Sequence, residues 1–279
     1  PEQLANLITP RTKLIYLNFP SNPTGGVAGK ELLEATAKVI LERCHPNVRV
    51  YSDEIYENII FDGQQHRSIS SVPEMAERTI IAGGFSKTYA WTGGRVGYAV
   101  FPSVKEADVF KTLNINYFSC VPPYNQEAAR EALENPLSQI AVKEMLETFE
   151  TRRNLIWQKI NEIPGITCQK PGGAFYLFPN ISGVCENLGL IEKHQRLSKE
   201  QQSSPDNIFQ MFALYEHQVA VLDRKSFGQI GADGKYFLRL SIAADQAVLE
   251  EGVQRLKAAS EDLSGLDKFL KERPDLIPA

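Results

Sequence analysis

The sequence has no run of basic residues and no long apolar stretch. Lysine and arginine number 30 against 34 aspartates and glutamates, so the 279-residue chain has a net charge of −4. This mild acidity argues against a nucleic-acid partner, because phosphate binding requires a concentrated positive field. Apolar stretches such as VAVL and AFYLF are far too short to span a bilayer, and PEQLANLITPRTK lacks the apolar segment of a signal peptide. We therefore expect no membrane partner.

Cysteine and histidine are also scarce, with four of each. The cysteines lie far apart and form no CxxC pair, so we expect reduced thiols in a cytoplasmic protein rather than disulfides or zinc ligands. The histidines have no metal-ligand spacing, and we predict no metal site. The eight residues are Cys44, Cys120, Cys168, Cys185, His45, His66, His194 and His217.

Hydrophobic residues, by contrast, make up 43% of the chain, enough to form the core of one large or two medium domains. In the first half, short apolar runs alternate with helical patterns. This alternation predicts an α/β fold, with a mostly parallel sheet and helices on both of its faces. The predicted strands lie within 13–20, 48–56, 78–87 and 94–102, and a helix is predicted over 29–44.

The second half predicts a smaller α+β domain. We place a partial large domain at 1–137, a connecting helix at 138–163 and a small C-terminal domain at 164–279. The polar segment 192–207 reads as a surface insertion, and the tail has no assigned role. Within the small domain we predict strands at 172–179, 219–224 and 235–243, and helices at 204–218 and 245–263.

Polar residues follow the predicted strands of the first half. In parallel sheets, ligands bind beyond the carboxyl ends of the strands, and these residues therefore form a candidate site. The segments are NFPSNPTGG, SDEIY, GGFSK and the start of GRVGYAVFP. They supply Asn22, Asp53, Tyr56, Ser86, Lys87 and Arg95.

A lysine at such a strand end suggests covalent chemistry with an aldehyde. In a site largely closed to water its pKa would be depressed, so that Lys87 could form a Schiff base. Pyridoxal phosphate is an aldehyde cofactor that also requires a carboxylate at its ring nitrogen and a cation at its phosphate. Asp53 and Arg95 could supply these groups. Asn22 and Tyr56 could donate hydrogen bonds to the ring's phenolate oxygen.

Each residue also has a simpler explanation. NPTG favours a type I turn, and Asp53 could cap the turn after its strand. Serine–lysine pairs after strands are common, and Arg95 could be an ordinary surface arginine. Their combined order, spacing and strand-end placement are much more specific than any one of them.

In combination, these motifs make the sequence resemble the class I/II, fold-type I pyridoxal-phosphate aminotransferases, the aspartate aminotransferase superfamily. The matching blocks run from about residue 14 to residue 258: SNPTGG, YSDEIYENIIFDG, GGFSKTYAWTGGRVGY, PGGAFYLFP and FLRLSIA. The resemblance implies that Lys87 forms the internal aldimine and moves the substrate proton. It also implies that Asp53 pairs with the ring nitrogen.

The same resemblance assigns the remaining roles. Tyr56 and Asn22 would bind the ring oxygen, and Asn22 would also lie near the substrate. Arg95 would bind the phosphate, with Ser86 either helping it or packing the turn. Arg239, in FLRLS, would bind the substrate's α-carboxylate.

The implied activity is transfer of an amino group between an L-amino acid and a 2-oxo acid, by a ping-pong mechanism in a homodimer. Three alternatives remain at this point. The chain could be another fold-type I enzyme, such as a lyase, decarboxylase or synthase. It could also be a non-catalytic aminotransferase-like binding module, or an inactive fragment.

The sequence departs from the family pattern in several places. Relatives carry a long N-terminal region before the first matching block, so we expect an exposed apolar edge here and consider a separate N-terminal fragment as a partner. Gly94 replaces a tryptophan common in relatives, which predicts looser packing beside Arg95. LDRKSFG replaces VPGSAFG, so Asp223, Arg224 and Lys225 could contact the substrate or form a solvated turn.

Overall fold

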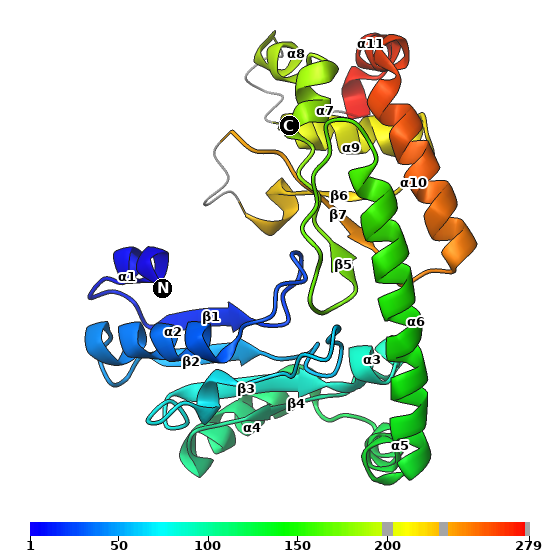
Figure 1. The fold of residues 1–279 in the computed structure, drawn as a ribbon. Coiled ribbons are helices and arrows are strands. Elements are labelled where there is room, and N and C mark those ends of the chain that lie inside the picture. Colours follow the sequence, from blue (N-terminus) through cyan, green and yellow to red (C-terminus); the bar gives the residue numbers. More distant parts are fainter. Residues whose placement is uncertain (197–202, 229–233, 277–279) are drawn as a thin grey trace. The chain divides into compact units, whose positions relative to one another are not determined.

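The computed structural model describes residues 1–196, 203–228 and 234–276. The chain divides into two compact units. Unit 1 contains residues 1–22, 26–147 and 172–174, and unit 2 contains residues 23–25, 148–171 and 175–279. Figure 1 shows the elements of both, and each unit is described by itself.

Unit 1 contains a four-stranded sheet in the order β1-β2-β3-β4. The strands β1, β2 and β3 are parallel, and β4 is antiparallel to β3 (Figure 1). All four predicted strands are present, and the prediction of a mostly parallel sheet is confirmed. Their bounds are Leu14–Asn18, Arg49–Asp53, Thr79–Gly84 and Gly97–Val100.

Helix α2 (Lys30–Arg43) packs against β1 and β2 through an apolar cluster of unit 1. Ile15 and Val50 are paired across the two strands and are both buried in this cluster. Side chains alternate along a strand, so the neighbouring Leu14 and Tyr16 point to the opposite face. Both are more than half exposed there. The buried members from the helix are Leu33, Ala37 and Ile40.

Two helices follow β4 that we did not assign from the sequence, α4 (Val104–Phe118) and α5 (Pro123–Glu134). Ser103 caps α4 by accepting a hydrogen bond from the Glu106 amide. No residue of α4 is buried. Its apolar side chains are therefore exposed, as are several on the two outer strands. The exposed apolar residues of α4 are Val104, Val109, Phe110, Leu113, Ile115, Tyr117 and Phe118.

The shorter elements of unit 1 complete its outline. They are α1 (Glu2–Leu7), α3 (Phe85–Thr88) and the 3-10 helices η1 (Ile69–Ser71) and η2 (Thr92–Gly94). Helix α6 (Pro136–Asn161) is the long helix that the sequence predicted. It begins in unit 1, and its residues from Thr148 onward belong to unit 2.

Unit 2 contains a small antiparallel sheet in the order β5-β7-β6. Its strands are β5 (Tyr176–Leu177), β6 (Leu222–Asp223) and β7 (Leu238–Ser241), each shorter than its predicted segment. Helices α9 (Pro205–Tyr215) and α10 (Gln246–Glu261) lie within their predicted segments. The unit also contains α7 (Ser182–Asn187), α8 (Leu190–Arg196), α11 (Leu263–Glu272), η3 (Lys225–Phe227) and η4 (Pro274–Leu276).

The polar segment predicted as an insertion begins within α8, and its residues 197–202 lie outside the described part of the chain. In the C-terminal tail, α11 is amphipathic and buries Leu266 and Phe269. The helices within the described ranges include none that is both long and apolar enough to cross a membrane. All four cysteines are free thiols, and Cys120 is the exposed one.

Candidate active site

The carboxyl ends of β1, β2 and β3 bring most of the predicted site residues to one edge of the unit 1 sheet. Asn18 pairs with Asp53, and Asp53 pairs with Ala82 on β3. The side-chain amide of Asn18 donates to the Asp53 carbonyl oxygen (3.2 Å), while its Oδ1 accepts from the Asn22 amide (2.7 Å). The loop that carries Asn22 is therefore tied to the strand end that carries Asp53.

The Asp53 carboxylate is held through both of its oxygens. Oδ1 accepts from the Ile55 amide (3.3 Å), so Asp53 caps the following turn, as its simpler explanation proposed. Oδ2 accepts from the hydroxyl of Tyr16 (2.7 Å), and this donor was absent from the sequence-based site. Although Tyr16 is more than half exposed, partial desolvation, the hydrogen bond to Asp53 and the charge of Asp53 together raise the pKa of Tyr16 well above its ordinary range. Tyr16 therefore stays a neutral donor.

Lys87 lies on the short helix α3, directly after β3. The helix is anchored by the buried residues Phe85 and Thr88, which leaves Ser86 and Lys87 half-buried between them. Lys87 Nζ lies 5.9 Å from the centre of the Tyr56 ring, and Tyr56 is buried. The structure thus brings the predicted lysine and tyrosine together, although they come from different strand ends.

Two glycines precede this helix because β4 passes very close to the end of β3. A Cβ atom on Gly83 would lie 2.4 Å from Cζ of Tyr98. A Cβ atom on Gly84 would lie 3.1 Å from the Gly97 Cα atom. The GG pair of GGFSK therefore leaves room for Tyr98 and for the close approach of β4 beside the lysine-bearing turn.

Arg95 follows η2 in a left-handed conformation with φ 53°. Its side chain is exposed and donates to the Thr92 carbonyl oxygen (3.0 Å). The looser packing predicted beside it is wrong. Gly94 is buried, and a Cβ atom there would lie 2.2 Å from the indole of Trp91. Trp91 therefore fills the space beside Gly94.

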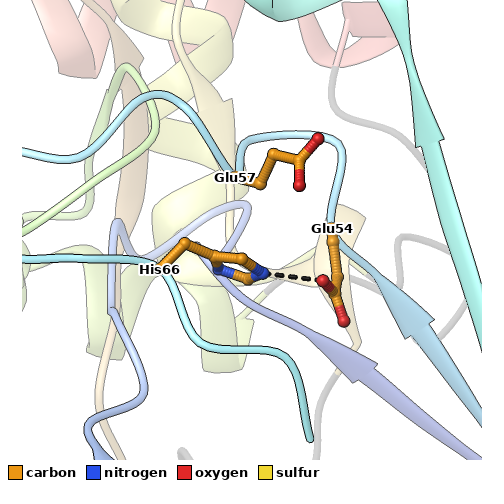
Figure 2. A group of neighbouring side chains, drawn as sticks. All are labelled: Glu54, Glu57 and His66. Atoms are coloured by element: carbon orange, nitrogen blue, oxygen red, sulfur yellow. Dashed lines mark hydrogen bonds and ion pairs between the residues drawn. The ribbon is translucent and has the colours of Figure 1, made fainter. Parts of the chain in front are cut away.

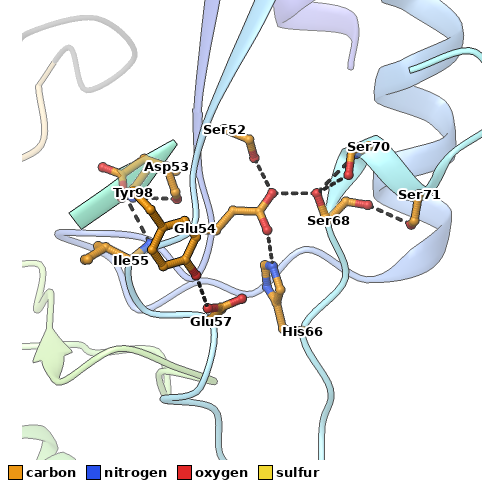
Figure 3. Close-up of polar contacts among 11 residues, drawn as sticks. Ser52, Asp53, Glu54, Ile55, Glu57, His66, Ser68, Ser70, Ser71 and Tyr98 are labelled. Atoms are coloured by element: carbon orange, nitrogen blue, oxygen red, sulfur yellow. Dashed lines mark hydrogen bonds and ion pairs between the residues drawn. The ribbon is translucent and has the colours of Figure 1, made fainter. Parts of the chain in front are cut away.

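A second polar cluster lies on the opposite side of β2 from Asp53. Alternation along the strand directs Ser52 and Glu54 to this side. Glu54 is 3% exposed, and its Oε1 accepts from Ser52 Oγ (2.8 Å) and Ser68 Oγ (2.6 Å). Its Oε2 lies 2.7 Å from His66 Nε2 (Figures 2 and 3). Glu54 thereby connects the end of β2 to the segment that leads into η1.

The charge of Glu54 is stabilised by these contacts. Burial acts to raise its pKa, but the hydrogen bonds from His66, Ser68 and Ser52 outweigh it, and the pKa lies below its ordinary value. Glu54, Glu57 and His66 also offer ligand atoms within 4.8 Å of one another (Figure 2). Since the Glu54 oxygens already accept three hydrogen bonds, the cluster is explained as a structural anchor.

Glu57 itself accepts a hydrogen bond from the hydroxyl of Tyr98 on β4 (3.0 Å), as Figure 3 shows. The turn after β2 is therefore attached to β4 as well as to η1. Sequence reasoning missed this cluster. The one available signal was strand alternation, which separates Asp53 from Glu54 onto opposite faces.

In unit 2, Arg239 lies on β7 between two aromatic rings. Its guanidinium carbon is 4.5 Å from the ring centre of Tyr176 and 4.9 Å from that of Phe227. Such contacts are cation–π interactions, and they restrict the orientation of the guanidinium plane.

Asp223, next to η3, is 2% exposed and belongs to a buried network. Its carboxylate accepts hydrogen bonds from Asn207 Nδ2 (2.9 Å), the Ser226 amide (3.2 Å) and Ser226 Oγ (2.5 Å). The prediction that Asp223 lies in a solvated turn is therefore wrong. Instead, Asp223 holds the turn that carries Phe227.

The groups at the strand ends of unit 1 fit pyridoxal 5′-phosphate. The aldehyde requires an amine, which Lys87 could supply, and the ring nitrogen requires a carboxylate, which Asp53 could supply. Asp53 is held in place by hydrogen bonds on both oxygens, as a fixed partner for a ring would be. Tyr56 and Asn22 lie at the same strand ends as hydrogen-bonding groups.

Comparison with known proteins supports the same interpretation. The profile of the family described as "Aminotransferase class I and II" matches residues 1–256. The chain is 36% identical over 274 residues to aromatic-amino-acid aminotransferase 2 of Thermococcus litoralis, covering 98% of this chain and 61% of that protein. It is 36% identical over 258 residues to the aspartate aminotransferase of Pyrococcus abyssi, covering 92% and 59%.

Solved structures share the fold. The aromatic aminotransferase of Pyrococcus horikoshii OT3 matches with a TM-score of 0.77 and 35% identity, over 99% of this chain and 64% of that chain. A PLP-bound structure from Clostridium difficile 630 matches with a TM-score of 0.77 and 26% identity, over 93% and 61%. The chain thus spans about three fifths of the length of the relatives named here. It belongs to the class I and II aminotransferase family, whose members use pyridoxal 5′-phosphate.

Proposed function

We propose that the protein is an aminotransferase that moves an amino group between an L-amino acid and a 2-oxo acid. The observation that carries this proposal is the arrangement at the strand ends of unit 1. Lys87 lies against Tyr56, and Asp53 is fixed at the end of the neighbouring strand. Family membership supports the same activity.

The bound cofactor would supply an aldehyde for the amino group and a ring that accepts electrons from the substrate's α-carbon. Lys87 would bind the aldehyde carbon and, once displaced by substrate, take the proton from the α-carbon. Asp53 would keep a proton on the ring nitrogen. Tyr56 and Asn22 would donate hydrogen bonds to the ring oxygen.

The two ends of the ligands require cationic groups. Arg95, with Ser86, would bind the phosphate, and its guanidinium suits the paired phosphate oxygens. Arg239 would bind the substrate carboxylate in the same bidentate manner, and Asn22 would lie beside the substrate. The rings of Tyr176 and Phe227 support this role for Arg239, because they hold its guanidinium plane before substrate arrives.

Product analysis tests the proposed activity. The protein is incubated with pyridoxal phosphate and one L-amino acid at a time, and the products are identified by mass spectrometry. We expect equal amounts of the matching 2-oxo acid and pyridoxamine phosphate, and none from Lys87→Ala. An amine product with release of carbon dioxide, or an elimination product, would contradict transamination.

The panel should include aspartate, alanine, phenylalanine and tyrosine. Two relatives named above are an aspartate aminotransferase and an aromatic-amino-acid aminotransferase. The preferred side chain follows from the ratio of kcat/KM values between these substrates.

We further propose that the enzyme acts as a homodimer in the cytoplasm. The exposed apolar side chains of α4, including Phe110, Tyr117 and Phe118, support a partner surface on unit 1. The four free thiols support a reducing compartment. Sedimentation at several protein concentrations tests the assembly. A monomer across the whole concentration range would contradict it.

A further inference from the structure

We propose that Tyr16 is a positioning residue that orients the Asp53 carboxylate toward the ring nitrogen of the cofactor. This inference rests on the proposed function, since it assumes that Asp53 pairs with the ring. It assigns a functional role to a residue outside the sequence motifs discussed above.

The sheet register places Tyr16 and Asp53 on the same face. Tyr16 on β1 is paired with Tyr51 on β2, and Asp53 lies two residues after Tyr51 on β2. The Tyr16 side chain therefore has to reach diagonally across the parallel strand pair to meet Asp53. The Tyr16 hydroxyl accordingly lies 2.7 Å from Asp53 Oδ2.

The ring of Tyr16 is itself held in place. It stacks on the Tyr51 ring, with centroids 5.6 Å apart and an angle of 14° between the planes. Stacking is a favourable arrangement for an aromatic pair, so it favours the ring orientation that directs the hydroxyl at Asp53. The donor is therefore fixed by the sheet and does not depend on a mobile loop.

The second oxygen of Asp53 has a different donor. Oδ1 accepts from the Ile55 amide (3.3 Å), whereas Oδ2 accepts from Tyr16. The terminal torsion of an aspartate is broad and can rotate at little cost. Two donors on opposite oxygens remove that freedom. Without Tyr16, the longer bond from Ile55 would be the one remaining hydrogen bond to this carboxylate among the described residues.

The donor also keeps its proton under working conditions. Partial desolvation, followed by the hydrogen bond and negative charge of Asp53, raises the pKa of Tyr16 well above its ordinary range, although the ring is more than half exposed. Tyr16 therefore stays neutral and donates a hydrogen bond to the Asp53 carboxylate. It does not place a second negative charge beside Asp53.

The first experiment requires no cofactor. The ring-carbon NMR signal of Tyr16 is assigned by its loss in Tyr16→Phe and is followed against pH in the wild-type protein and in Asp53→Asn. We expect Tyr16 to stay protonated past its usual pKa of about 10 in the wild-type protein and to titrate at lower pH in the variant. Titration at the usual pH in both proteins would overturn the proposal.

The second experiment is a cycle of affinities. Pyridoxal phosphate is compared with an analogue whose ring nitrogen is replaced by carbon, using the wild-type protein, Tyr16→Phe and Tyr51→Phe. We expect Tyr16→Phe to weaken the affinity for pyridoxal phosphate by about tenfold, which is the effect of one charge-assisted hydrogen bond. The affinity for the analogue should be unchanged. Tyr51→Phe is the matched control and should change neither affinity.

The outcomes distinguish a failure of the role proposed for Tyr16 from a failure of the proposed function. Equal weakening of cofactor and analogue by Tyr16→Phe would mean that the ring only packs, and it would overturn the proposal. An unchanged or tighter affinity for pyridoxal phosphate would overturn it as well. If the wild-type protein binds neither molecule, the proposed function fails, while the NMR titration still reports whether Tyr16 holds Asp53.

Discussion

Replacing Glu54 with alanine removes the acceptor shared by three donors. Ser52, Ser68 and His66 all bond to this carboxylate, which is 3% exposed. A hydrogen bond to a charged group contributes about 1.5–3 kcal/mol, and Glu54→Ala removes three of them. Ser68 and His66 are partly exposed and can regain water, so we expect Glu54→Ala to lower the free energy of unfolding by about 3–5 kcal/mol, less than the full sum. This is a large share of the roughly 5–15 kcal/mol typical of a native protein.

Urea unfolding followed by circular dichroism measures this loss. Glu57→Ala is the control in the same turn. Glu57 accepts one hydrogen bond, from the partly exposed Tyr98, so its loss should cost only about 0.5–1.5 kcal/mol. A Glu54→Ala loss below about 1 kcal/mol, or one equal to that of Glu57→Ala, would refute the reasoning.

Three further predictions concern the pH dependence of stability, the packing at Gly183 and the aromatic contact of Arg239. The pKa of Glu54 is lower in the folded protein than its unfolded value of about 4.3, so the charged carboxylate stabilises the fold above that pH and ceases to do so as the pH falls through the folded pKa. In urea unfolding at a series of acid pH values, the difference in the free energy of unfolding between the wild-type protein and Glu54→Gln should therefore shrink as the pH falls. A difference that stays constant would contradict this prediction. Gly183→Ala should lower the free energy of unfolding by about 1–3 kcal/mol, because its Cβ would lie 2.7 Å from the Gly165 Cα. The control Gly93→Ala should change the urea midpoint little, since no atom lies within 4 Å of a Cβ placed there. Equal effects of the two variants would argue against this packing. Phe227→Leu should raise the KM for the amino acid about threefold to tenfold, because it removes the ring that stacks on Arg239. Phe227→Tyr keeps the ring and should leave the KM unchanged. An unchanged KM in Phe227→Leu would contradict a role of this ring in orienting Arg239.

The central features of the fold could be predicted from the sequence because they depend on local patterns. The apolar runs at 13–20, 48–56 and 78–87 lie between polar turns, and each contains one of the three parallel strands. The long helical pattern likewise predicted α6. The polar residues after these strands follow from the same reasoning, since strand ends of a parallel sheet meet at one edge.

The helices α4 and α5 were not predicted for a physical reason. Helix prediction relies on an apolar stripe that faces a core, and α4 buries none of its residues. Its apolar side chains lie instead on exposed surface, among them Phe110 and Tyr117.

The contacts of the candidate site depend on register and loop geometry. The bond from Tyr16 to Asp53 requires the alignment of β1 with β2, which the individual strand sequences do not specify. Likewise, Glu54 and His66 are separated by a loop whose path cannot be read from composition. The filling of the space at Gly94 by Trp91 depends on a turn of the same kind.

The most direct test of the account is to locate the covalent attachment of the cofactor. The protein is mixed with pyridoxal phosphate, reduced with borohydride, digested and analysed by mass spectrometry, with Lys87→Ala as the control. We expect a phosphopyridoxyl group on the Lys87 peptide and on no other peptide. A label spread over surface lysines, or a label unchanged by Lys87→Ala, would contradict Lys87 as the cofactor-binding lysine.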